Sequence, residues 1–233
     1  MKKIILHTCV LTGLALAASG SALAESVTLK LGWADVNPNS AASAVTGPFT
    51  PADTLGLKVQ KQTTLFFSAA TDISSNVELE LALGVPPKHD GTLVILKPSG
   101  VPGSVAALDG QVLSRVRQVA PTLFANYKFG DSASQLRPFV GVGLNFTRFD
   151  QTESTAVNDA MNGGPTTIKL KDSFGPAFQL GASYKLGGPW SLNGSWSTAR
   201  VQTKLMTNTL GIVRTSEILF HPSVFVLAVG YSF

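Results

Sequence analysis

The sequence is nearly free of cysteine, because Cys9 is the only one among 233 residues. A chain with a single cysteine forms no internal disulfide and no cysteine-rich metal site, which excludes disulfide-stapled folds and zinc ribbons. Charged residues are also scarce, at 14% against about 25% in soluble domains. The formal charge of +4 comes from 18 basic and 14 acidic residues spread over the chain, so we expect no nucleic-acid partner.

Long apolar runs are missing after the first 24 residues. Residues 1–3 form a short basic start, residues 4–16 are apolar, and small residues lead up to Ala24. This order is typical of a secretory signal peptide cleaved after Ala24, since the apolar core is shorter than the roughly 20 residues of a spanning helix. We therefore expect a signal peptide over 1–24, the loss of Cys9 on cleavage, and one mature domain over 25–233.

The sequence has a mean hydropathy of +0.23, which is high for a protein without spanning helices. A transmembrane β-barrel fits, because its outer face is apolar although no single segment is a long apolar run. The final stretch, VFVLAVGYSF, alternates in this way. Phe225, Leu227 and Val229 share one face of the expected strand, and Ala228 and Gly230 share the other.

Alternating segments recur eight times along the chain. They cover about residues 26–36, 58–70, 77–84, 115–129, 137–149, 170–186, 190–205 and 218–233. Short turns at 71–76, 130–135 and 187–189 alternate with mostly longer connections, rich in Gly, Pro, Ser, Thr and Asn, at 37–57, 86–114, 150–169 and 206–215. This pattern predicts an all-β fold, an eight-stranded antiparallel transmembrane β-barrel with short periplasmic turns and long extracellular loops. A soluble lipocalin-like barrel is the alternative.

Five charged residues fall on the inward parity of their expected strands. They are Lys30, Glu78, Glu80, Lys171 and Lys185. Charges facing lipid are costly, so we expect these side chains in the lumen. They would pair there as a structural plug; an electrostatic filter is the alternative, and it would need an open aqueous path.

Aromatic residues near the segment ends suit the membrane interfaces. The candidates for this aromatic girdle are Trp33, Tyr184, Trp190, Tyr231 and Phe233. A terminal Phe on the last strand also resembles the C-terminal signal by which the outer-membrane insertion machinery recognises its substrates. Outer-membrane lipid and this machinery are therefore expected partners.

Four stretches are similar to the OmpW family of outer-membrane proteins. They are LGWADVNP (31–38), APTLFANYKFGDSASQLRPFVGVGLNFTRF (120–149), LKDSFGPAFQLGASYKLGGPWSLN (170–193) and HPSVFVLAVGYSF (221–233). GVPPK (84–88), GPAFQLG (175–181) and YKLGGPW (184–190) resemble the AlkL-type branch, which is associated with uptake of hydrophobic hydrocarbons. The resemblance implies an outer-membrane location in a Gram-negative bacterium, a partly apolar lumen, and cargo that leaves sideways through the wall.

The sequence departs from the family at SWSTARV (195–201), which lacks an aromatic-rich run, so no constriction residue is carried over there. Pro86 resembles the family's side-opening residue. Pro86 and Pro87 donate no backbone hydrogen bond and could weaken the wall, or they could simply end the strand above the bilayer. An apolar loop entrance is expected next to them, at Val85, Leu93, Val94, Ile95 and Leu96, since exposed apolar patches usually bind something.

Catalytic signatures are missing from the sequence. Outside the signal region the only histidines are His89, in an expected loop, and His221, beside Pro222. Neither belongs to an evident triad or HExxH motif, so we expect no enzyme, no cofactor and no metal site. The predicted function is an outer-membrane channel for passive uptake of small hydrophobic molecules, with lateral release into the bilayer. The alternative is a structural or adhesive barrel with a plugged lumen and interacting loops.

Overall fold

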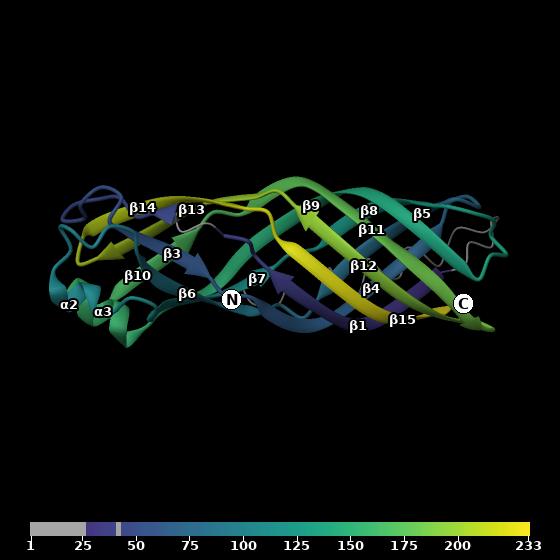
Figure 1. The fold of residues 1–233 in the computed structure, drawn as a ribbon, viewed down its shortest axis with the longest axis horizontal. Helices are drawn as coiled ribbons and strands as arrows, with labels where there is room; N and C mark the ends of the chain where they lie inside the picture. Colours follow the sequence, from purple (N-terminus) through teal and green to yellow (C-terminus); the bar gives the residue numbers. More distant parts are fainter. Residues whose placement is uncertain (1–26, 41–42) are drawn as a thin grey trace, which may run out of the picture.

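The computed structural model describes residues 27–40 and 43–233, which form an elongated tube of antiparallel strands (Figure 1). The expected signal peptide, including Cys9, lies outside the described residues. The described part contains two short helices, α2 (Gly103–Ala106) and α3 (Ala156–Asn162), and neither is long enough to cross a membrane.

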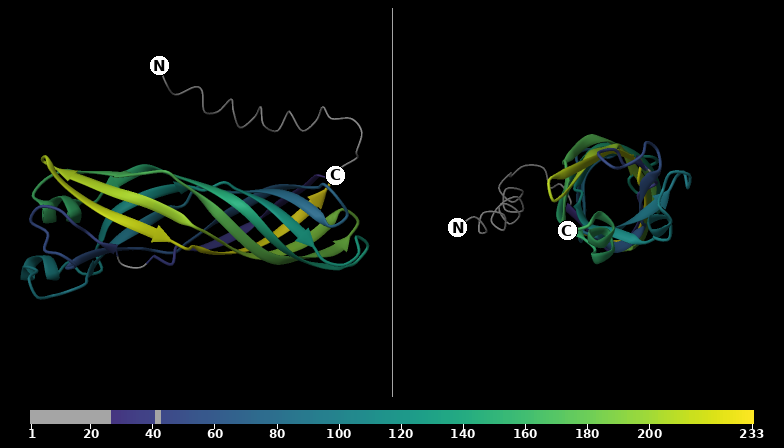
Figure 2. Two further views of the ribbon diagram at one scale, coloured as in Figure 1. Left: turned by 90° about the horizontal axis from the view of Figure 1, so that it is seen from above. Right: turned by 90° about the vertical axis from the view of Figure 1, so that its left-hand side faces the viewer.

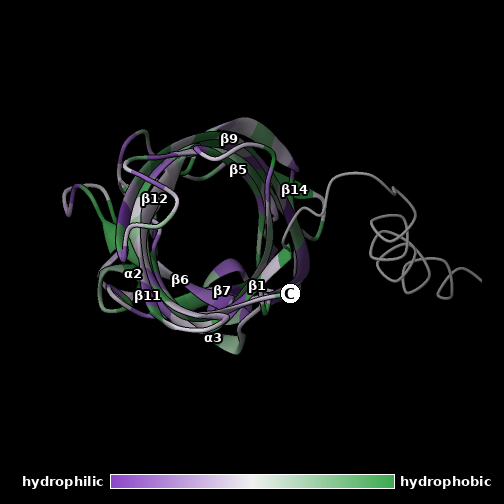
Figure 3. Ribbon diagram, turned by 90° about the vertical axis from the view of Figure 1, so that its right-hand side faces the viewer, coloured by the Kyte–Doolittle hydropathy of each residue, from purple (hydrophilic) through white to green (hydrophobic). Residues whose placement is uncertain are grey.

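Eight strands close into a barrel, which confirms the predicted fold class. They are β1 (Val27–Asn37), β4 (Gln62–Asp72), β5 (Val77–Gly84), β8 (Thr122–Lys128), β9 (Leu136–Ser154), β11 (Ser173–Gly187), β12 (Trp190–Ala199) and β15 (Ser223–Ser232). Each is antiparallel to the next, and β15 pairs with β1 from Thr28–Ser232 to Asn37–Ser223. The end-on views show the resulting ring (Figures 2 and 3). Because the ring closes, no strand edge is left bare in hydrocarbon.

The barrel turns its bulky side chains outward. On β15, Phe225 and Leu227 are 58% and 59% exposed, whereas Ala228 between Leu227 and Val229 is 2% exposed. On β1, Trp33 is exposed and the neighbouring Ala34 is buried. An apolar exterior around a closed antiparallel sheet is the arrangement that lipid requires, and it rules out the soluble lipocalin-like alternative.

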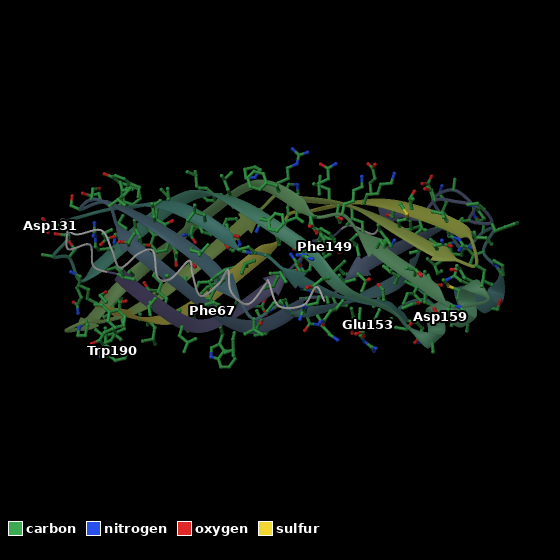
Figure 4. All side chains as sticks on the ribbon, turned by 180° about the vertical axis from the view of Figure 1, so that it is seen from behind. Phe67, Asp131, Phe149, Glu153, Asp159 and Trp190 are labelled. Atoms are coloured by element: carbon green, nitrogen blue, oxygen red, sulfur yellow. The ribbon has the colours of Figure 1, made fainter. Side chains whose placement is uncertain are left out.

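The two ends of the tube differ in the way that was predicted. Short turns at 73–76, 129–135 and 188–189 lie at one end, which also holds the start of β1 and the end of β15. Trp190 and Asp131 mark this short-turn end, and Glu153 and Asp159 mark the other (Figure 4).

The long connections contain strands and helices of their own. They contain β2 (Ser43–Ala44), β3 (Leu55–Val59), β6 (Lys88–Ile95), β7 (Val112–Val119), β10 (Thr166–Leu170), β13 (Val201–Thr209) and β14 (Ile212–Phe220). The strands β7, β6, β3 and β2 extend the sheet from the far end of β9, and β10, β13 and β14 form a second sheet. Reciprocal backbone bonds of 2.9 and 2.8 Å between Thr46 and Thr215 join the two sheets. We call these seven strands, together with the far end of β9, the outer extension.

Several segments predicted as single strands are interrupted where the barrel meets the outer extension. The predicted strands at 115–129, 190–205 and 218–233 break at 120–121, 200 and 221–222. Two of these breaks contain a proline, which has no ladder N–H. Of the described barrel strands, only β9 continues into the outer extension.

Candidate transport path and wall interruption

Three cavities follow one another from the tip of the outer extension to the middle of the barrel. The outer cavity has a volume of about 140 Å³, the neck cavity about 60 Å³ and the mid-barrel cavity about 140 Å³. Leu57 and Leu205 line both the outer and neck cavities. Val36 and Val201 line both the neck and mid-barrel cavities. The shared residues place the three cavities on one path.

The wall of the neck cavity is mainly apolar. Val201, Leu205, Ile218 and Phe220, from β13 and β14, line it, and together with Ile168 they form a buried hydrophobic cluster. Alternate residues of these strands point into the tube because side chains of a strand alternate between its two faces. The outer extension therefore supplies an apolar interior as well as its outer wall.

Charged side chains close the lumen below the mid-barrel cavity. Lys30 Nζ lies 3.3 Å from Glu78 Oε1 and 3.0 Å from Glu80 Oε1, and all three residues are buried. Ser68 Oγ donates to Glu80 Oε1 at 2.7 Å, and Gln179 Nε2 donates to Glu80 Oε2 at 3.2 Å. Three of the five predicted lumen charges thus meet in one cluster.

The remaining members of this cluster were not predicted. Asn126 Nδ2 donates to Glu78 and to Glu80 at 3.1 Å each. Lys128 Nζ lies 3.3 Å from Glu78 Oε2 and also contacts Asp72. Asn126 and Lys128 share the inward parity of β8, so the alternation held a signal that could have found them. We call Lys30, Ser68, Glu78, Glu80, Asn126, Lys128 and Gln179 the charge cluster.

A separate, polar cavity of about 510 Å³ lies on the short-turn side of the charge cluster. Lys30, Asp72 and Lys128 line it, together with Arg137, whose Nη2 donates to the carbonyl of Ser75 at 2.8 Å. None of its lining residues is shared with the mid-barrel cavity. The charge cluster is therefore a partition between an apolar half and a polar half of the lumen.

Two predicted lumen charges do not join the charge cluster. Lys171 is exposed, in the break between β10 and β11, because the chain has already left the barrel wall there. Lys185 is exposed near the short-turn end, where its Nζ donates to the carbonyl of Ser132 at 2.5 Å.

The barrel wall loses its backbone pairing around Pro86 and Pro87. On one side, the β5–β8 ladder ends at Ala82–Thr122, and pairing resumes where Gln118 N–H donates to the Pro87 carbonyl at 3.0 Å. On the other side, Val85 N–H donates to Leu65 and the next bond of the described backbone runs from Gln60 N–H to Asp90, each at 2.9 Å. We call residues 83–87 and the facing 119–121 the wall interruption.

The mid-barrel cavity reaches this wall interruption. Leu83, Gly84, Pro87 and Ala120 all line it. A mainly apolar cavity therefore borders a part of the wall in which the backbone ladder is interrupted and two prolines remove donors.

The residues predicted as a loop entrance are spread over different places. Four of them lie on or just after strand β6 and not in an irregular loop. Leu93 is buried and lines the outer cavity, whereas Val94, Ile95 and Leu96 line none of the four cavities described above. Val85 is 48% exposed and belongs to the wall interruption. Successive side chains of β6 point to opposite faces of the strand, so these sequence neighbours do not line one common surface.

The predicted aromatic residues lie on the outside of the barrel. At the short-turn end, the ring of Tyr231 packs edge-on against Trp190 at 4.9 Å and against Phe233 at 4.8 Å. Tyr184 is 40% exposed, and Trp33 lies further along the wall, paired with Leu227. A further aromatic pair, Phe178 and Trp196, with ring centroids 6.4 Å apart, was not predicted.

Comparison with known proteins agrees with this architecture. Residues 24–233 match the profile of the OmpW family. Outer membrane protein W of Salmonella typhimurium is 30% identical over 237 residues, covering 100% of both chains. Outer membrane protein AlkL of Ectopseudomonas oleovorans is 31% identical over 182 residues, covering 76% of this chain and 69% of AlkL. The crystal structure of OprG from Pseudomonas aeruginosa superposes with a TM-score of 0.77 at 24% identity, covering 90% of this chain and 96% of OprG.

The match over residues 24–233 confirms the resemblance seen in the sequence, and AlkL is among the relatives that the resemblance implied. The closed barrel, its apolar exterior and these relatives lead to one conclusion: the chain belongs to the OmpW family and lies in the outer membrane of a Gram-negative bacterium.

Proposed function

We propose that this protein is a passive channel that takes up small hydrophobic molecules and releases them sideways into the bilayer. One observation supports the proposal: three mainly apolar cavities that share lining residues follow one another down to the charge cluster, beside the wall interruption. Molecules would pass from the outer cavity through the neck to the mid-barrel cavity. They would leave between residues 83–87 and 119–121.

Transfer energies favour this route over the straight one. Each CH₂ group gains about 0.8 kcal/mol when it leaves water for an apolar phase. A molecule that crossed the charge cluster into the polar cavity would lose this gain and would have to displace Lys30 from Glu78 and Glu80. A molecule that slips through the wall avoids the charge cluster and keeps mainly apolar surroundings, so the bilayer is the favourable destination.

The C-terminal strand has the features expected of an insertion signal. The C-terminal strand β15 ends beside Phe233, which is 73% exposed. We propose that the outer-membrane insertion machinery recognises this strand, since an alternating apolar face and a terminal aromatic residue are the expected signal.

Uptake measurements on cells test the proposal. We would compare decane uptake in cells with and without the protein, and then in cells carrying Gly84→Phe at equal expression. A Cβ at Gly84 would lie 3.3 Å from Leu65 O and 3.7 Å from Thr64 Cγ2, so the backbone must shift slightly to accept it. Gly84 lines the mid-barrel cavity, and a Phe ring there would obstruct the cavity beside the wall interruption.

Gly194→Phe is the matched control. A Cβ at Gly194 has no neighbour within 4 Å, and the residue shares the outward parity of Trp190 and Leu192 on β12. We expect the protein to accelerate uptake, Gly84→Phe to slow it and Gly194→Phe to leave it unchanged. Equal uptake with and without the protein would contradict transport and favour a structural or adhesive barrel.

A further inference from the structure

His89 is a buried polar side chain on the proposed path. It lies on β6, two residues after Pro87, is 3% exposed, and lines both the neck and mid-barrel cavities. Of the described residues, Ser114 and Gln118 are the only ones besides His89 that bring polar side chains to the neck cavity. Any molecule that moves from the outer cavity to the wall interruption would pass this imidazole.

The two ring nitrogens of His89 have different surroundings. Nδ1 lies 2.9 Å from the backbone oxygen of Gln60. A carbonyl oxygen only accepts hydrogen bonds, so Nδ1 carries the proton and donates it. Nε2 is buried and has no hydrogen-bond partner among the described residues.

The imidazole is neutral at neutral pH. Burial holds the pKa of His89 below its ordinary value, and this effect outweighs the opposing influence of the Gln60 carbonyl and of Asp90. In the neutral ring with a proton on Nδ1, Nε2 presents a free lone pair. The imidazole that lines the path therefore holds a buried hydrogen-bond acceptor whose capacity is unused, and a cargo molecule must push aside the atoms that cover Nε2 to reach it.

An unpartnered atom is not sufficient by itself to mark a site. Ser216 Oγ and Thr71 Oγ1 are also buried without a partner, but neither residue lines any of the four cavities described above. His89 combines an unused acceptor with a position where two apolar cavities meet. A buried acceptor of this kind is unfavourable until a donor reaches it.

We propose that His89 Nε2 accepts a hydrogen bond from cargo, so that the preferred cargo is an apolar chain or ring with one hydroxyl group, such as an aliphatic alcohol or a phenol. This inference rests on the proposed function, whose path it refines. An alkane can pass but leaves the acceptor unpaired. An ionised carboxylate has only acceptors and no proton to offer, so it is disfavoured.

Nitrogen NMR of the imidazole side chains tests the inference directly. The processed protein, purified without a polyhistidine tag and placed in lipid nanodiscs, is expected to contain only His89 and His221. Decane, decanol and decanoate are added in turn, and the methyl groups of Val201, Leu205 and Ile218 report whether each one occupies the neck cavity. We expect decane and decanol to shift the methyl signals, and only decanol to shift the Nε2 signal of His89.

Two failures can be told apart in this experiment. If decanol shifts the methyl signals while Nε2 stays unchanged, the inference about His89 is wrong and the proposed path survives. If no compound shifts the methyl signals, the path itself is wrong.

Two variants provide a second readout by direct binding to the protein in nanodiscs. His89→Asn keeps a donor for the Gln60 carbonyl but removes the acceptor at Nε2, and His89→Phe removes both nitrogens while keeping a ring. In each variant the ratio of decanol affinity to decane affinity should fall by roughly 3- to 10-fold, as expected for one neutral hydrogen bond. An unchanged ratio in His89→Asn would overturn the assignment of Nε2.

Discussion

Removing the lysine of the charge cluster should destabilise the barrel strongly. Lys30→Met keeps a long apolar side chain but leaves Glu78 and Glu80 without the ammonium that now lies 3.3 and 3.0 Å away. Breaking a buried ion pair by removing one partner costs about 3–5 kcal/mol, because the other charge stays buried and uncompensated. We expect a loss of this size in the free energy of unfolding, measured by urea unfolding in lipid vesicles with tryptophan fluorescence.

Two comparisons separate this effect from a general loss of charge. Lys88 pairs with Glu153 at 3.1 Å, but their side chains are 49% and 50% exposed, so Lys88→Met should cost only about 0–1 kcal/mol. Adding Glu78→Gln and Glu80→Gln to Lys30→Met should recover much of the loss, since no buried charge then lacks its partner. Equal losses for Lys30→Met and Lys88→Met would refute the reasoning.

Three further predictions concern the wall, its closure and the outer extension. Replacing Pro86 and Pro87 with Thr restores backbone donors at the wall interruption, so decane uptake at equal expression should slow; unchanged uptake would remove the lateral exit. A Cβ at Gly32 would lie 2.0 Å from a backbone oxygen of β15, so Gly32→Val should prevent β1–β15 closure and abolish the compact band that folded barrels give in unheated gels. The Arg117 guanidinium donates two 2.7 Å bonds to Asp150 and lowers the pKa of that carboxyl. The stabilisation by this pair is therefore complete above the ordinary Asp pKa of about 4, and it is lost as the pH falls through the lower folded value. Hydrogen-exchange protection factors of the β7 amides should fall over the same pH range. In Asp150→Asn this pH dependence should disappear.

Alternation along single strands was readable from the sequence. The faces of β15 and the inward direction of Lys30, Glu78 and Glu80 follow from a period of two residues, since lipid selects the bulky face. The barrel, its strand number and its short turns could be predicted for the same reason.

The alternation did not predict which segments pair with one another across the sheet. The outer extension forms because 88–92 pairs with 112–117, and 201–209 with 212–220. A short run that alternates does not tell whether it continues a barrel strand or begins a new one. This ambiguity merged β7 with β8, and it placed Lys171 in the lumen although the chain leaves the wall there.

The charge cluster and the path were only partly predictable. Each charge could be assigned to the inward face, but the meeting of Lys30 on β1 with the two carboxylates of β5 depends on the register of β1, β4 and β5. The unused acceptor of His89 depends on a contact with Gln60, 29 residues away. Neither leaves a local trace in the sequence.

Contacts between cargo and protein test the central claim most directly. Protonated decane would be added to deuterated protein in deuterated lipid, and intermolecular nuclear Overhauser effects would be recorded at the amide protons. The account predicts contacts at Val36, Leu83 and Ala120, above the charge cluster and at the wall interruption, and none at Thr28, Ser191 or Asn193 in the polar cavity. Equally strong contacts in the polar cavity would contradict it, because decane would then pass straight through the barrel.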